Sequence, residues 1–138
     1  MYKTILVTLE TTPTDRAIID HVKELAKAMT SRVVLLHVAT GVPAKFHGAD
    51  AAGQEIEEDQ EYLRRVRAEF EAEGIPVGTE LAFGDPVKEI VKWVQEQGCD
   101  LVAMSTHGHQ FVADLILGAT ASRVQHSISV PVLLLRAK

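Results

Sequence analysis

The chain between residues 5 and 38 has the sequence ILVTLETTPTDRAIIDHVKELAKAMTSRVVLLHV. It begins and ends with apolar runs, residues 5–7 and 33–38, of the kind found in strands that are buried on both faces. Between them, apolar side chains recur at the period of one helix face; they are Ile18, Val22, Leu25 and Met29. The stretch therefore predicts a strand, a helix and a second strand, and such a unit pairs its two strands in parallel.

The helix of this unit has a recognisable start at residues 12–15, Thr-Pro-Thr-Asp. We expect Thr12 to cap the helix and Pro13 to occupy its first position, where a missing N–H costs nothing. Asp15 stands where the acid of a capping box belongs.

The middle of the chain continues the alternation. Residues 39–55 contain three Gly residues and one Pro and show no sustained period, which predicts a long surface loop. A charged helix should follow and end at Gly74, with its apolar side formed by Ile56, Leu63, Val66 and Phe70. Residues 77–83 then alternate apolar and polar side chains, which is typical of an edge strand.

A third helix is expected from residue 86. Asp85 is its predicted cap and Pro86 its first residue. Gly98 is placed to end the helix in a left-handed conformation.

The last third of the chain completes the pattern. We predict a strand at residues 101–104, an irregular segment at 105–118, a helix at 119–127 and a strand at 130–135. Pro131 cannot donate to a strand ladder, so this last strand should lie at an edge. Strands that alternate with helices predict an α/β fold, in which a parallel sheet of five strands is covered by helices on both faces.

Length and composition limit the function. The chain has 138 residues, which suits a single domain spanning 1–138, and 46% of them are hydrophobic. Its formal charge of −5 argues against binding to nucleic acid or to an anionic membrane surface. No apolar run approaches the length of a membrane helix. A single Cys fits a reducing compartment, so we expect a cytoplasmic protein.

In a parallel sheet of this kind, ligands bind beyond the carboxyl ends of the strands, where the winding direction reverses. The segment after the fourth strand carries Gly108 and, after nine intervening residues, Gly118. Gly108 allows a ligand to approach the backbone, and Gly118 opens a helix whose first amides are unpaired. Together they favour an anion site, although glycines also occur at ordinary strand-to-helix turns.

Nearly the whole chain resembles the universal stress protein family. The resemblance rests on five blocks in the family's order and spacing, which are YKTILV (2–7), VLLHV (34–38), GDP (84–86), THG (106–108) and VPVLLLR (130–136). It implies an adenine nucleotide alpha hydrolase-like, Rossmann-like fold with strand order 3-2-1-4-5. It also implies a stress-response or signalling module that forms a homodimer through Val130–Leu135 and binds ATP or another adenine nucleotide, with Mg at the phosphates.

The nucleotide-binding members share a signature of Gly, two residues, Gly, nine residues, and Gly followed by Ser or Thr. Gly108 and Gly118 match it, whereas Ser105 replaces the first Gly and Ala119 replaces the hydroxyl residue. By the same resemblance Glu10 matches an acidic residue that faces the nucleoside, and Val38 a backbone that meets the adenine edge. The predicted binding residues are Thr8, Leu9, Glu10, Val38, Met104, Ser105, Thr106, Gly108, His109, Gly118, Ala119 and Thr120.

The two departures leave three functions open. If the first signature position needs a positive φ, Ser105 is strained; if it only needs room, Ser105 adds a hydrogen-bonding group. Thr120 can compensate for Ala119. The alternatives to nucleotide binding are a nucleotide-independent dimeric adaptor with an eroded pocket and a slow ATP hydrolase. Hydrolysis would depend on Glu10 and His109, and neither is convincingly placed.

Other polar residues have structural explanations. We expect His37 to be a hydrogen-bonded core or strand-end residue, Cys99 a buried inert thiol and Trp93 a cover for the sheet. An acidic run is predicted to be the solvated start of the second helix, where negative charge suits the helix dipole; it comprises Glu55, Glu57, Glu58 and Asp59.

No metal site and no catalytic residue are expected from the sequence. His107 and His109 flank Gly108, but two imidazoles are too few for a closed zinc site and no third ligand has suitable spacing.

Overall fold

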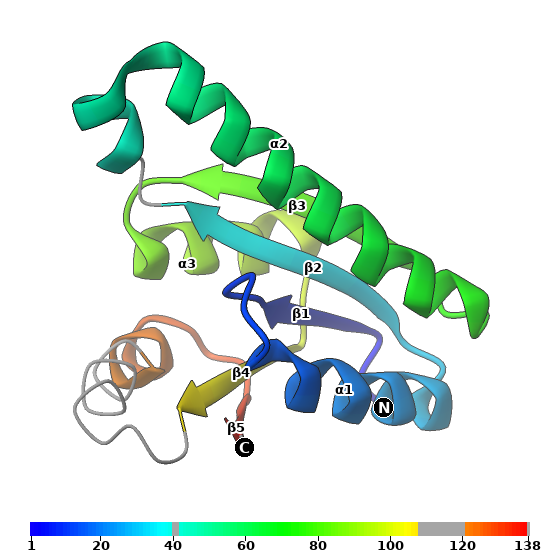
Figure 1. The fold of residues 1–138 in the computed structure, drawn as a ribbon. Helices are drawn as coiled ribbons and strands as arrows, with labels where there is room; N and C mark the ends of the chain where they lie inside the picture. Colours follow the sequence, from blue (N-terminus) through cyan, green and yellow to red (C-terminus); the bar gives the residue numbers. More distant parts are fainter. Residues whose placement is uncertain (40–41, 108–120, 138) are drawn as a thin grey trace.

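The strands form one parallel sheet in the order β3-β2-β1-β4-β5, as Figure 1 shows for the computed structural model. The structure describes residues 1–39, 42–107 and 121–137. Every neighbouring pair of strands is parallel. The predicted α/β class, sheet and strand order are confirmed. The strands are β1 (Thr4–Thr8), β2 (Arg32–Ala39), β3 (Val77–Phe83), β4 (Leu101–His107) and β5 (Val132–Ala137).

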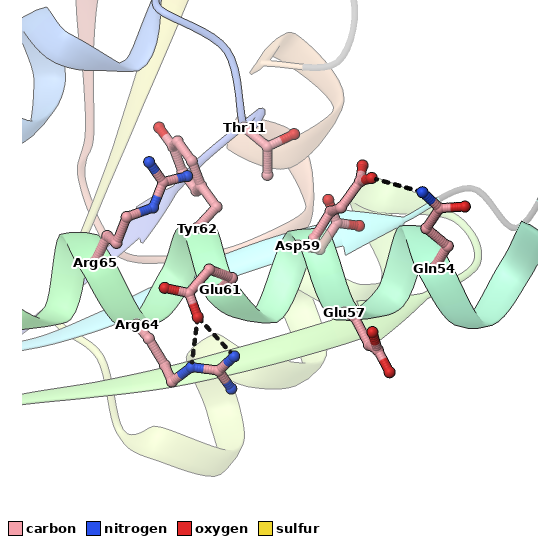
Figure 2. A pocket seen from close by; sticks show the side chains of 9 residues that line it. Thr11, Gln54, Glu57, Asp59, Glu61, Tyr62, Arg64 and Arg65 are labelled. Atoms are coloured by element: carbon pink, nitrogen blue, oxygen red, sulfur yellow. Dashed lines mark hydrogen bonds and ion pairs between the residues drawn. The ribbon is translucent and has the colours of Figure 1, made fainter.

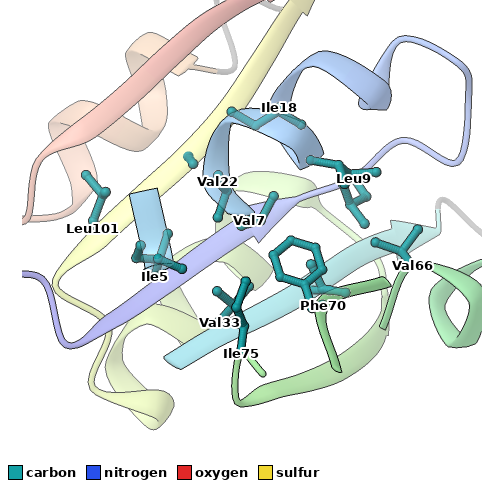
Figure 3. Close-up of a cluster of buried hydrophobic side chains, with 14 of the residues drawn as sticks. Ile5, Val7, Leu9, Ile18, Val22, Val33, Val66, Phe70, Ile75 and Leu101 are labelled. Carbon is teal, nitrogen blue, oxygen red and sulfur yellow. The ribbon is translucent and has the colours of Figure 1, made fainter. Parts of the chain in front are cut away.

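Helices cover both faces of the sheet, each face with its own apolar core. They are α1 (Asp15–Met29), α2 (Val42–Ala72), α3 (Pro86–Gln97) and a helical segment at residues 121–127. The α1 and α2 side contains Ile18, Val22 and Phe70, packed on the strands (Figure 3). The opposite side packs α3 and residues 121–127 on the sheet through Ile90, Val94 and Val124, among others. Burial on both faces explains why β1, β2 and β4 are apolar runs.

The third helix begins and ends as predicted. The Asp85 carboxylate accepts the amide hydrogen of Lys88 at 2.9 Å, Pro86 opens the helix, and Gly98 ends it with φ of 63°. The start of α1 differs from the prediction. Thr14, not Thr12, occupies the cap position, and it makes no side-chain cap. Asp15 instead reaches back to the amides of Glu10 and Thr11, so a longer turn than a capping box connects β1 to α1.

The prediction of a surface loop at residues 39–55 is wrong from Val42 onward, because α2 begins there and continues to Ala72. Pro43 lies in the first turn, where it removes no helical hydrogen bond. Gly53 lies inside the helix at a cost of about 1 kcal/mol relative to Ala, and the length of the helix tolerates it. The acidic run consequently lies inside α2 rather than at its start.

The ends of the last two strands also differ from the prediction. β4 continues through Ser105 to His107, so the start of the expected irregular segment is strand. β5 begins at Val132, after Pro131, whose carbonyl accepts the Val102 amide hydrogen. The predicted edge positions of β3 and β5 are both confirmed. Across the described ranges, no helix combines the length and apolar character needed to cross a membrane.

Candidate functional site

A crevice opens where β1 and β4 part. These strands are paired from Ile5↔Leu101 to Val7↔Ala103. Beyond that point the chain after β1 remains hydrogen-bonded to β2, because the Leu9 amide donates to the Leu36 carbonyl. This is the position at which the winding of the sheet reverses, and there ligands bind in sheets of this kind. A cavity of about 280 Å³ lies there. Its lining residues are Thr8, Leu9, Glu10, Leu36, His37, Val38, Pro86, Ile90, Met104 and Ser105.

The cavity combines apolar walls with a few polar groups. Leu36, Val38 and Met104 come from the strands, and the first turns of α3 add Pro86 and Ile90. Glu10 and Ser105 supply polar groups near the ends of β1 and β4. A small cavity with apolar walls and few polar groups suits a flat, largely apolar ring that carries polar edges.

The structure brings part of the predicted site together. The predicted residues at this cavity are Thr8, Leu9, Glu10, Val38, Met104 and Ser105. Thr106 lies on β4 but not among the lining residues. Gly108, His109, Gly118, Ala119 and Thr120 lie outside the described residues. The sequence analysis did not predict that α3 lines the cavity, although it predicted the start of that helix from Asp85 and Pro86.

Ser105 has an ordinary strand conformation. Among the described non-glycine residues, positive φ angles occur at Thr11 and Thr30, so this position does not need glycine's backbone freedom. The Ser105 hydroxyl is buried and has no hydrogen-bond partner within the described part of the chain. The sequence left open whether Ser105 is strained or adds a hydrogen-bonding group, and the hypothesis of backbone strain is therefore wrong.

A buried carboxylate holds the segment that follows β1. Asp15 is only 1% exposed. It accepts amide hydrogens from Glu10 at 2.9 Å and Thr11 at 2.9 Å, and the Tyr62 hydroxyl donates to it at 2.6 Å. Burial, reinforced by the hydrogen bond to Asp15, raises the pKa of the Tyr62 phenol far above its ordinary value. Tyr62 therefore stays protonated and remains a donor.

His37 is a hydrogen-bonded strand-end residue, as predicted. Its Nδ1 lies 2.7 Å from the Leu9 carbonyl, and its Nε2 lies 3.6 Å from Oδ2 of Asp59. Asp59 is only 8% exposed. The prediction that the whole acidic run is solvated is thus wrong at Asp59, because the run lies on a helix that packs one face against the sheet.

A second, more open hollow of about 840 Å³ runs along α2. Figure 2 shows Asp59, Tyr62 and Arg65 on the side of the helix that faces Thr11, with Arg64 and Glu57 on the other side. Its lining residues are Thr11, Gln54, Glu57, Glu58, Asp59, Glu61, Tyr62, Arg64 and Arg65. Most are exposed charges on one helix, in contrast to the mixed lining of the crevice.

Cys99 and Trp93 match their predicted structural roles. Cys99 is buried, and burial raises the pKa of its thiol to about 11. Trp93 packs against the apolar core on the α3 side. The described residues contain no group of three His, Cys, Asp or Glu side chains arranged to hold a metal ion.

Comparison with known proteins identifies the family of this chain. The sequence profile of the universal stress protein family matches residues 1–136. The chain belongs to the universal stress protein family. One relative is universal stress protein MJ0577 from Methanocaldococcus jannaschii, 26% identical over 157 residues that cover 100% of this chain and 97% of the relative. This chain superimposes on the solved structure of MJ0577 with a TM-score of 0.84, and the alignment covers 98% of that protein at 28% identity.

Two further solved structures of universal stress proteins share the fold at 18% identity. One is a complex with cAMP; its alignment with this chain has a TM-score of 0.72 and covers 97% of this chain and 96% of that protein. The other is an Archaeoglobus fulgidus protein in complex with dAMP; its alignment has a TM-score of 0.71 and covers 96% of this chain and 97% of that protein. At this identity they establish the shared architecture.

Proposed function

We propose that this universal stress protein binds an adenine nucleotide in the crevice between the ends of β1 and β4. The observation that carries the proposal is the cavity itself, which lies at the winding reversal and joins apolar walls to the polar groups of Glu10 and Ser105. An adenine ring has the shape and the polar edges that such a lining accommodates. The Ser105 hydroxyl, which is buried and has no partner among residues 1–39, 42–107 and 121–137, supplies a hydrogen-bonding group for the ligand.

The relatives support the same ligand class. Universal stress proteins of the same fold have been solved with cAMP and with dAMP, which share an adenine base, a sugar and one phosphate. The cavity of about 280 Å³ suits a nucleoside portion. Gly108 and Gly118, which match the family signature, are the proposed phosphate contacts for ATP with Mg, and they lie outside the described residues.

Calorimetric titration with AMP, and with ATP in the presence and absence of Mg²⁺, tests the proposal. The Val38→Trp variant fills the cavity, and Val91→Trp is its matched control, because both valines are partly buried on the α3 side and, of the two, Val38 alone lines the cavity. We expect binding by the wild type and by Val91→Trp, and at least a tenfold loss, about 1.4 kcal/mol, in Val38→Trp.

The titration also distinguishes the competing functions. Absence of heat and of thermal stabilisation at millimolar nucleotide would refute the nucleotide site and leave the dimeric adaptor. Phosphate release above a protein-free control would favour slow hydrolysis. Because a ligand at 100 times its Kd stabilises the folded state by about 2.7 kcal/mol, a thermal shift is a sensitive second readout.

We also propose that the protein forms a homodimer through β5. This strand lies at one edge of the sheet, where its outer side has no strand partner within the described residues, and Leu134 is 42% exposed on it. An exposed apolar edge is a surface for strand pairing. Sedimentation should show a dimer that Leu134→Glu converts to monomer. Phe83→Glu, which changes an exposed apolar residue on the opposite edge strand, should remain dimeric; a wild-type monomer would refute the proposal.

A further inference from the structure

The segment Leu9, Glu10 and Thr11 lies between the two cavities. Leu9 and Glu10 line the crevice between β1 and β4, whereas Thr11 lines the hollow along α2. Thr11 has a φ of 62°, in the left-handed region that non-glycine residues seldom adopt. Such a conformation persists only when surrounding contacts hold it, and it is found disproportionately at functional sites. The contacts that hold this segment therefore bear on the ligand site.

The strongest of these contacts passes through Asp15. Its carboxylate accepts amide hydrogens from Glu10 and Thr11, which are consecutive residues of the segment. The remaining bond comes from α2, because the Tyr62 hydroxyl donates to Oδ2 at 2.6 Å. With Asp15 almost fully buried, these are charge-assisted bonds shielded from water. Tyr62 is thus connected to the backbone of Glu10 through one side chain.

A second contact links the same segment to α2. The Leu9 carbonyl lies 2.7 Å from Nδ1 of His37, and the other ring nitrogen of His37 faces Asp59 at 3.6 Å. Asp59 and Tyr62 are three residues apart, so they lie on one face of the helix. Figure 2 shows both side chains directed toward the side where Thr11 lies. The chain after β1 is therefore bonded to α2 through Asp15 and Tyr62, and on the other side of Glu10 it is bonded to His37, whose ring faces α2.

We propose that Asp15 and Tyr62 are positioning residues of the nucleotide crevice: α2 sets the place of Glu10 through the Tyr62–Asp15–amide contacts. The inference rests on the proposed nucleotide site. By thermodynamic linkage the effect is reciprocal, so a ligand that orders Glu10 also strengthens the Tyr62–Asp15 contact. Ligand binding in the crevice therefore changes the contacts of Thr11 and Tyr62, which both line the hollow along α2. A signalling module requires a response of this kind at its surface.

Tyr62→Phe removes the donated hydrogen bond and keeps the packing of the ring. Tyr2→Phe is the matched control, because Tyr2 is the other tyrosine of the chain, is also partly buried against the same core, and lies before β1 at the far end of the strand from Glu10. Calorimetry with AMP as the probe measures the Kd of both variants. A second pair of titrations repeats Tyr62→Phe in a Glu10→Ala background, which completes a double-mutant cycle.

We expect Tyr62→Phe to weaken AMP binding roughly three- to tenfold, as coupled neighbouring residues do, and Tyr2→Phe to bind like the wild type. In the Glu10→Ala background the effect of Tyr62→Phe should fall below about twofold, since a positioning residue has no function without the group it positions. A merely structural role would weaken binding equally in both backgrounds. Amide exchange at Glu10 and Thr11 should become faster in Tyr62→Phe and slower when AMP binds the wild type.

The outcomes separate this inference from the proposed function. If the wild type does not bind AMP or ATP, the nucleotide site fails and the positioning role fails with it. If the wild type binds but Tyr62→Phe has the same Kd, or if its effect is undiminished in Glu10→Ala, only the positioning role is overturned. Unchanged amide exchange at Glu10 and Thr11 in Tyr62→Phe would overturn it independently of any titration.

Discussion

Replacing Ser105 with Ala should make the free protein more stable and its complex with AMP weaker. The Ser105 hydroxyl is buried beside the crevice without a partner among the described residues. An unsatisfied buried polar group costs about 1–3 kcal/mol. Ala removes that group and leaves only a small void, so we expect a gain of about 1 kcal/mol in the free energy of unfolding. For a domain of this size that corresponds to a rise of roughly 3–6 °C in Tm.

The same change removes a hydrogen bond that the ligand would make. A neutral hydrogen bond contributes about 0.5–1.5 kcal/mol, so AMP affinity should fall about two- to tenfold. Thermal unfolding monitored by circular dichroism, with and without AMP, measures both effects. Ser127→Ala is the control, because the Ser127 hydroxyl is exposed and bonds locally to the Arg123 carbonyl; its Tm and affinity should stay near wild type. A Ser105→Ala protein that is less stable, or that binds AMP as tightly as the wild type, would refute the reasoning.

Two further predictions concern titratable groups away from the crevice. Burial acts to raise the pKa of Asp100, but the amide hydrogens of Lys3 and Thr4 outweigh it and hold that pKa below its ordinary value. The stabilisation by Asp100 is therefore present above its unfolded pKa and lost as pH falls through the lower folded value: Asp100→Asn should lower Tm at pH 7 and converge with the wild type in acid, and equal Tm values at pH 7 would contradict this. The Cys99 thiol, with its pKa raised to about 11 by burial, should react slowly with iodoacetamide at pH 8 in the folded protein and rapidly in denaturant; equal rates would show that the thiol is accessible.

Much of the sheet could be predicted because burial on both faces leaves a strong local signal. The runs around Ile5 and Val34 are apolar throughout, and Asp85 with Pro86 marks a helix start within a few residues. The strand order followed from resemblance to a family, since local patterns do not determine which strands become neighbours.

The contacts around the site were harder to predict, because they join residues far apart in the chain. Asp15 suits a capping box in its local context, yet it bonds to Tyr62, 47 residues away. Asp59 belongs to an acidic run that a solvated helix would explain, and only the packing of α2 places it beside His37. Pro43, Gly48 and Gly53 indicate a loop when considered alone, whereas in the structure all three lie within the long helix α2.

The location of the ligand can be mapped by recording backbone amide chemical shifts of the 15N-labelled protein during titration with AMP. Binding in the crevice predicts shifts concentrated on the ends of β1, β2 and β4, with Leu36, Val38, Met104 and Ser105 among the residues that move most. It also predicts little change at the amino ends of the same strands, near Thr4 and Arg32. An unchanged spectrum at millimolar AMP, or shifts confined to the exposed charges of α2, would contradict nucleotide binding in this crevice.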